Sequence, residues 1–190
     1  MSAPAGREAV YDDLYGLPEN VVGEILAGEL HVSPRPAIPH ALAASGLGAS
    51  VLAPFGFGAG GPGGWWILME PELHLGRDVL VPDLGGWRRE RLPRIGDVVG
   101  LTLRPDWVCE ILSPSTQLRD RAIKLGIYAR EGVPHVWLVD PLARLLEVYG
   151  LHEGRWLILG VHQSLEKVRA EPFEAVELAL GLLWGETEEK

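Results

Sequence analysis

Two acidic residues lie within apolar surroundings in the middle of the sequence. Asp83 ends the apolar run 79–83, and Glu110 lies inside the run 107–112 with apolar neighbours on both sides. A carboxylate is costly to bury unless it is paired or binds a metal, so both are candidates for metal-binding or catalytic acids. Two plainer alternatives are a turn-forming Asp83 and a solvated Glu110 on an edge strand.

A lysine follows Glu110 on the next predicted helix. Lys124 is the only Lys in the first 166 residues of a chain with 14 Arg and three Lys. Asp120, Lys124 and Tyr128 are four residues apart, and this spacing puts them on one stripe of a helix. Lys124 is therefore a candidate to reach the carboxylate site, and a surface pair with Asp120 is the alternative.

Other polar residues are candidates for the same site. Glu70 and Glu72 are two residues apart on one predicted strand, hence on one face, and either could join Asp83 across a hairpin. His40 begins an Ala-rich helix, and Glu24 lies near the N-terminus. The sequence has no HExxH zinc motif, no GxSxG, no phosphate-binding loop with GK[ST] and no dinucleotide-binding fingerprint.

The elements that must position these residues follow from periodicity and turn signals. A strand, a helix and a second strand in succession predict a crossover between neighbouring parallel strands, and the hairpins predict antiparallel pairing elsewhere. We expect one domain over residues 1–190 with a frayed tail at 186–190. Its fold class is α/β, bordering on α+β, with one central mixed sheet flanked by helices. The predicted helices are 8–17, 39–53 and 114–131, and the predicted strands are 29–33, 65–75, 78–87, 106–112, 135–139, 145–149 and 155–159.

Composition excludes several classes of protein. The net charge of −9 argues against avid, non-specific binding to nucleic acid. A single cysteine, Cys109, excludes an internal disulfide framework and a multi-cysteine metal site. We expect no membrane-spanning segment and no signal peptide, and hence a cytoplasmic protein.

The motifs together resemble the Uma-two family of the PD-(D/E)XK restriction-endonuclease-like superfamily. The resemblance spans nearly the whole chain. It is clearest in Pro-Asp-Trp-Val-Cys-Glu-Ile-Leu-Ser-Pro-Ser-Thr at 105–116 and Trp-Leu-Val-Asp-Pro at 137–141. It implies a restriction-endonuclease-like core with an added C-terminal β-hairpin and a metal-dependent site that cleaves phosphodiester bonds.

The resemblance also assigns roles to the central residues. Asp83 corresponds to the Asp of the PD motif and Glu110 to the second acid. The lysine expected two residues after that acid is replaced by Leu112, and Lys124 resembles a migrated replacement. By this likeness, Asp83 and Glu110 hold Mg²⁺ or Mn²⁺ with the carbonyl of Ile111.

The same likeness gives outer positions to four more residues. Glu72 is implied as a further metal ligand and Glu24 as an outer one, and His40 and Tyr128 are implied to line the cleft. The function implied is a nuclease that hydrolyses DNA, acting as a homodimer through the hairpin 145–159 or the segment 178–184.

Two other functions remain open at this stage. A non-catalytic binding or assembly module that keeps the nuclease fold would explain the net charge. It would also explain why the one basic cluster is the short run 88–91 with Arg94. A two-carboxylate glycosidase would use Asp83 and Glu110 but would leave Lys124 without a role.

Overall fold

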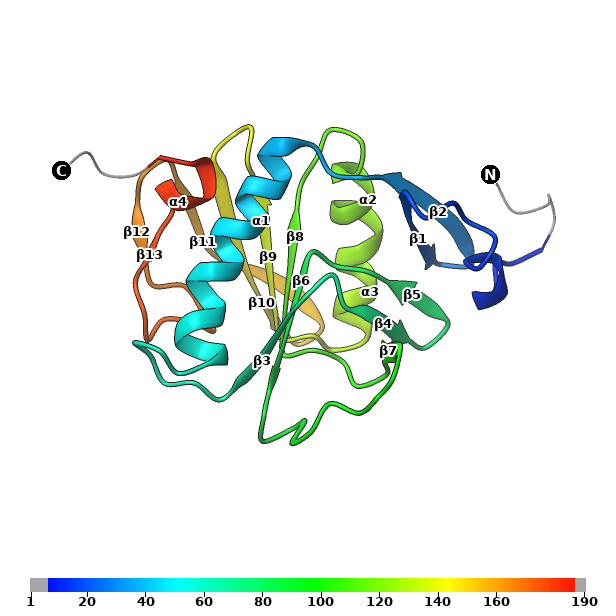
Figure 1. Ribbon diagram of the computed structural model, residues 1–190, viewed down its shortest axis with the longest axis horizontal. Helices are drawn as coiled ribbons and strands as arrows, with labels where there is room; N and C mark the ends of the chain where they lie inside the picture. The colour runs from blue at the N-terminus through cyan, green and yellow to red at the C-terminus, as the bar shows by residue number, and fades with distance from the viewer. Residues whose placement is uncertain (1–6, 187–190) are drawn as a thin grey trace.

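The computed structural model describes residues 7–186 and has helices packed beside mixed β-sheets (Figure 1). Residues 187–190, which make up most of the predicted frayed tail, lie outside this range. The helices are α1 (Ile38–Val51), α2 (Gln117–Arg119), α3 (Leu125–Arg130) and α4 (Gly181–Trp184), with a 3₁₀ turn at Tyr11–Asp13 and π-helical turns at Leu52–Gly56 and Asp120–Lys124. The strands are β1 (Val21–Leu26), β2 (Glu29–Pro34), β3 (Trp65–Met69), β4 (Glu72–Leu75), β5 (Asp78–Leu80), β6 (Leu84–Arg88), β7 (Gly100–Leu101), β8 (Trp107–Ile111), β9 (His135–Asp140), β10 (Leu145–His152), β11 (Arg155–Gln163), β12 (Lys167–Val168) and β13 (Leu178–Ala179).

A six-stranded mixed sheet forms the centre of the fold, in the order β11-β10-β9-β8-β6-β3. Strands β8 and β9 are parallel and are joined through the helical segment 117–130, as the strand–helix–strand pattern predicted. The other neighbouring pairs in this sheet are antiparallel. The predicted hairpin is present as β10 and β11, and it extends the sheet beyond β9.

Side chains of β8 alternate between two cores, one on each face of this sheet. Trp107, Cys109 and Ile111 pack with α1 in one core, whereas Val108 packs with α3 residues in the other. Glu110 has the parity of Val108 and therefore points to the α3 face. The sequence prediction that Glu110 shares a face with Val108 is confirmed.

Helix α1 covers the opposite face through fully buried Ala43, Leu47 and Val51. With its π turn it forms the 19-residue stretch Ile38–Gly56, which by length and composition alone could cross a membrane. The sequence analysis expected no such stretch. In this structure the buried side of the helix belongs to the core beside Trp107 and Trp137. Helices of a protein core can have the same length and composition.

A second sheet of five strands, in the order β2-β1-β5-β4-β7, departs from the expected single sheet. It arises because both predicted central strands are broken. The run 65–75 breaks at Glu70, which has a positive φ of 44°, and at Pro71. The run 78–87 breaks at residues 81–83, between β5 and β6, and Asp83 is the last residue of this break. At each break the chain crosses from one sheet to the other. Glu70 and Asp83 therefore lie at the junction between the two sheets.

Two helix predictions needed correction. The predicted helix 8–17 is only a 3₁₀ turn, Tyr11–Asp13, because its three apolar residues bury too little surface to stabilise a longer helix. The predicted helix 114–131 begins at Gln117 and contains the π turn Asp120–Lys124. Gly132 follows the end of the helix with φ 74°, as expected for a C-terminal glycine.

Candidate active site

Glu110 of β8 is the centre of a buried polar cluster. Lys124 Nζ lies 3.0 Å from Glu110 Oε2, and the Tyr128 hydroxyl donates a 2.5 Å hydrogen bond to Oε1. Glu110 is only 2% exposed, and Lys124 is 3% exposed. Both carboxylate oxygens are thus engaged by residues of the helical segment, as the 120–124–128 stripe required.

Lys124 bridges three carboxylates rather than one. Its Nζ also lies 2.8 Å from Glu24 Oε1 and 3.6 Å from Asp120 Oδ1. The π turn, which inserts a wider turn into the helix, contains both Asp120 and Lys124, and both are buried. Such turns are frequent at functional sites. Glu24 is fixed in turn by the backbone N–H of Val81, which donates to Oε1 at 2.9 Å.

Burial shifts the protonation of this cluster. Burial raises the pKa of Glu110 well above its usual value, although the charge of Lys124 opposes the shift. Burial raises the pKa of Asp120 in the same way. Burial alone would lower the pKa of Lys124, but the surrounding carboxylates hold it above its usual value, so the ammonium stays charged.

Asp83 lies beside Glu110 at the junction of the two sheets. Its Oδ2 accepts a 2.6 Å hydrogen bond from the backbone N–H of Ile111, and its Oδ1 lies 3.1 Å from His40 Nε2. Burial alone would lower the pKa of His40, but the hydrogen bond and charge of Asp83 hold it above its usual value. The side chains of Asp83 and His40 are 17% and 13% exposed, so this end of the site is less buried than Glu110 and Lys124 and is partly accessible to solvent.

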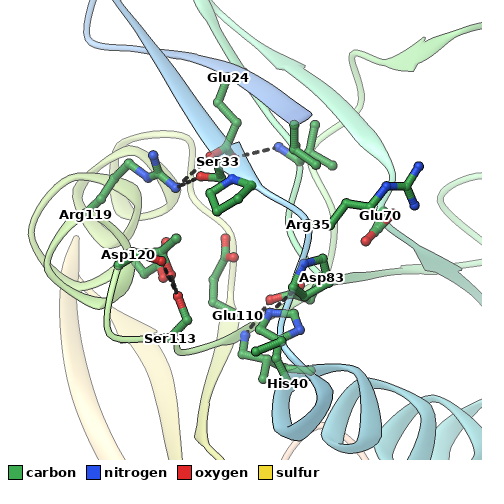
Figure 2. A pocket seen from close by; sticks show the side chains of 18 of the residues that line it. Glu24, Ser33, Arg35, His40, Glu70, Asp83, Glu110, Ser113, Arg119 and Asp120 are labelled. Atoms are coloured by element: carbon green, nitrogen blue, oxygen red, sulfur yellow. Dashed lines mark hydrogen bonds and ion pairs between the residues drawn. The ribbon is translucent and has the colours of Figure 1, made fainter. Parts of the chain in front are cut away.

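Apart from Tyr128, these residues line one pocket of about 290 Å³. Tyr128 is fully buried behind Glu110 and does not line the cleft, contrary to the expectation from the resemblance. In Figure 2, Arg119 and Asp120 lie on one side, Asp83 and His40 on the other, and Glu110 between them. The basic residues that line it are Arg35, Arg119 and Lys124, and the acidic ones are Glu24, Glu70, Asp83, Glu110 and Asp120.

The excess of carboxylates fits a hard cation. Among the described residues no group of three or more His, Cys, Asp or Glu side chains is arranged to hold a metal. Mg²⁺, however, commonly takes only one or two carboxylates and keeps several waters. Asp83 and Glu110 meet this need for two carboxylates, because carboxylate oxygens are hard ligands. The backbone of Ile111 lies next to both residues, and Asp83 is partly accessible to solvent.

The structure places Glu72 away from this pocket, contrary to the expectation that it joins the two acids. Its Oε1 accepts a 2.7 Å hydrogen bond from the Tyr11 hydroxyl and lies 2.6 Å from His74 Nε2. The break at Glu70 and Pro71 is the reason, because strand alternation does not continue across it. Glu70 lines the pocket instead, and its backbone N–H donates to the Asp83 carbonyl at 3.0 Å.

The basic run 88–91 does not reach the pocket either. Arg88 stacks over Trp65, and Arg89 stacks over Trp66 and donates to the Trp65 carbonyl. Arg91 pairs with Asp106. These contacts place the cluster at the end of β6, away from the pocket. Two arginines that the sequence analysis did not single out, Arg35 and Arg119, line the pocket instead. Arg119 directly precedes Asp120 in the chain.

A known family matches most of the chain. Residues 10–181 match the family Uma2, described as "Putative restriction endonuclease". The chain belongs to the Uma2 family. The resemblance noted in the sequence is therefore confirmed, and Uma2 membership supports a nuclease-like role.

A solved structure shares the Uma2 chain's fold. It is described as a "putative nuclease belonging to DUF820 from Anabaena variabilis ATCC 29413" and has a TM-score of 0.68 and 22% sequence identity. The alignment covers 93% of this chain and 98% of that chain. At this identity the likeness establishes the nuclease-like fold. No curated protein matches the chain.

Proposed function

We propose that this Uma2 chain is a metal-dependent nuclease that hydrolyses phosphodiester bonds in DNA. The observation that carries the proposal is the convergence of Asp83, Glu110 and Lys124, from the sheet junction, β8 and the helical segment, on one acid-rich pocket. Restriction-endonuclease-like families generally use divalent cations. A glycosidase would leave the Lys124–Glu110 contact without a function.

Each residue has a distinct role in this proposal. Asp83 and Glu110, with the Ile111 carbonyl, would hold Mg²⁺ or Mn²⁺. A cation held there would supply polarisation of the phosphoryl oxygen and a lowered pKa for a bound water. Lys124 keeps Glu110 oriented and supplies positive charge beside the reacting phosphate. His40 fixes the outer oxygen of Asp83.

Two residues of the sequence-based site take lesser roles, and a third takes none. Glu24 is an outer residue that orients Lys124, and Tyr128 orients Glu110. Glu72 is not proposed as a metal ligand because it lies with Tyr11 and His74. The homodimer remains a prediction, which light scattering of the purified protein tests.

A second candidate function is a non-catalytic module on the same fold. The observation that favours it is the complete engagement of Lys124, whose ammonium contacts three carboxylates and is 3% exposed. A buried cation of this kind can serve the fold alone. The net charge of −9 also disfavours avid DNA binding.

Cleavage assays on the full chain separate the two candidates. Single-stranded and plasmid DNA are incubated with Mg²⁺ or Mn²⁺ and the wild type, Asp83→Asn or Glu72→Gln. We expect cleavage by the wild type, a loss of about 100-fold or more in Asp83→Asn, and wild-type rates in Glu72→Gln. Equal cleavage by the wild type and Asp83→Asn refutes the nuclease assignment to this pocket.

A further inference from the structure

Arg119 stands out in the pocket because its hydrogen-bonding capacity is largely unused. Its Nη2 donates to Ser33 Oγ and lies 3.7 Å from Glu24 Oε2, which is beyond hydrogen-bond distance. Its Nε is buried and has no hydrogen-bond partner among the described residues. Buried donors are almost always paired, so an unpaired one at a pocket wall indicates a missing acceptor.

The guanidinium is held in place by the fold around it. The Arg119 side chain is 15% exposed, and Ser33 of β2 fixes one of its nitrogens. An arginine presents five N–H donors in a rigid planar fork that matches an oxyanion such as phosphate. Because most of that fork is uncommitted and already oriented, an anion could bind without ordering a flexible side chain first.

Hydroxyl groups continue the same wall of the pocket. Ser113 Oγ lies 3.0 Å from both Ser115 Oγ and Thr116 Oγ1, and all three residues line the pocket with Arg119. Arginine and Ser or Thr hydroxyls are the groups that usually contact nucleic-acid phosphates. This wall therefore adds a guanidinium and hydroxyls to the carboxylate of Asp120, which lies on the same side of the pocket (Figure 2).

We propose that Arg119, with the hydroxyls of Ser33 and Ser113, forms a subsite for a phosphate next to the one that is cleaved. The proposal rests on the proposed function, because the cleaved phosphate would lie at Asp83 and Glu110. Arg119 is linked to Glu110 through Glu24 and Lys124, so the two phosphate positions would be neighbours on one strand. The substrate class is then a chain with at least two consecutive phosphates.

Calorimetry with thymidine 3′,5′-bisphosphate, a probe with two phosphates, tests this subsite in the presence of Mn²⁺. We expect Arg119→Gln to weaken probe binding by about 10- to 100-fold, the effect of losing charge-assisted hydrogen bonds. Arg121→Gln is the matched control, because Arg121 lies on the same helical segment but pairs with Glu147. It should bind the probe as the wild type does.

Further arms make each outcome decisive. Arg119→Lys keeps the positive charge but lacks the planar set of N–H donors, so it should bind the probe less tightly than the wild type. This variant replaces Arg119→Gln in the test if Arg119→Gln does not fold. Unchanged binding in both Arg119 variants, or no probe binding by the wild type, overturns the subsite. If instead the probe binds in an Arg119-dependent manner but Mn²⁺ does not bind at Asp83, the subsite stands and the proposed metal-dependent function fails.

Discussion

Removal of the Lys124 charge should destabilise the protein strongly and in a pH-dependent way. In Lys124→Met, Glu24, Glu110 and Asp120 would lose the ammonium that lies 2.8, 3.0 and 3.6 Å from their oxygens. Loss of one partner from a buried ion pair costs about 3–5 kcal/mol. This is a large part of the roughly 5–15 kcal/mol by which domains are stable.

The sign of the pH effect follows from the carboxyl groups. Burial raises the folded-state pKa of Glu110 and Asp120, so their stabilising contribution is complete below their unfolded values, about 4, and is lost as pH rises through the raised values. Without Lys124 these folded pKa values rise further. The stability difference between wild type and variant should therefore be largest at pH 7 and should shrink toward pH 4–5.

Urea unfolding followed by tryptophan fluorescence measures this difference. At pH 7 a loss of about 3–5 kcal/mol should lower the urea midpoint of Lys124→Met by roughly 1–5 M, given a dependence of about 1–3 kcal/mol per M. The control is Arg144→Ala, which removes a half-exposed pair with Glu186 and should cost less than about 1 kcal/mol. A Lys124 variant as stable as the wild type at pH 7, or a loss that does not change with pH, would refute the reasoning.

Two further predictions test packing and the position of Glu72. Gly46→Ala should destabilise the protein by about 1–3 kcal/mol, because a Cβ there would meet the Leu182 carbonyl oxygen at 2.6 Å. Gly126→Ala has open space around it and should stabilise the protein by roughly 0.5–1 kcal/mol. Thermal unfolding measures both changes in stability, and changes of the same sign would contradict the packing described. Glu72 raises the pKa of Tyr11 to about 12 by accepting its hydrogen bond. Glu72→Gln should lower that pKa toward 10, and an unchanged ultraviolet titration would contradict this.

Local pattern was sufficient to predict the parallel strands β8 and β9 and the helical segment between them. The run 107–112 is apolar on both faces apart from Glu110, which is the pattern of a strand buried on both sides. Gly132 is the residue type expected just past a helix end, and the helical segment ends there. The face of Glu110 then followed from alternation alone. The contact to Lys124 was one of two alternatives that the helical spacing left open, the other being a surface pair with Asp120.

What the sequence did not predict depended on breaks and distant partners. The run 65–75 has the pattern of one continuous strand, but the positive φ at Glu70 and the following proline end it. As a result Glu70, and not Glu72, lines the pocket. Glu24 reached Lys124 only because β1 belongs to a second sheet. Arg119 gave no periodic signal, since its importance lies in a buried nitrogen without a partner.

The central claim is that Asp83 and Glu110 together bind a divalent cation. Calorimetric titration of Mn²⁺ into the wild type, Asp83→Asn and Glu72→Gln tests it most directly. We predict one binding site in the wild type, none in Asp83→Asn, and an unchanged site in Glu72→Gln, with all three proteins folded by circular dichroism. Mn²⁺ binding that survives in Asp83→Asn, or no binding to the folded wild type, would contradict the account.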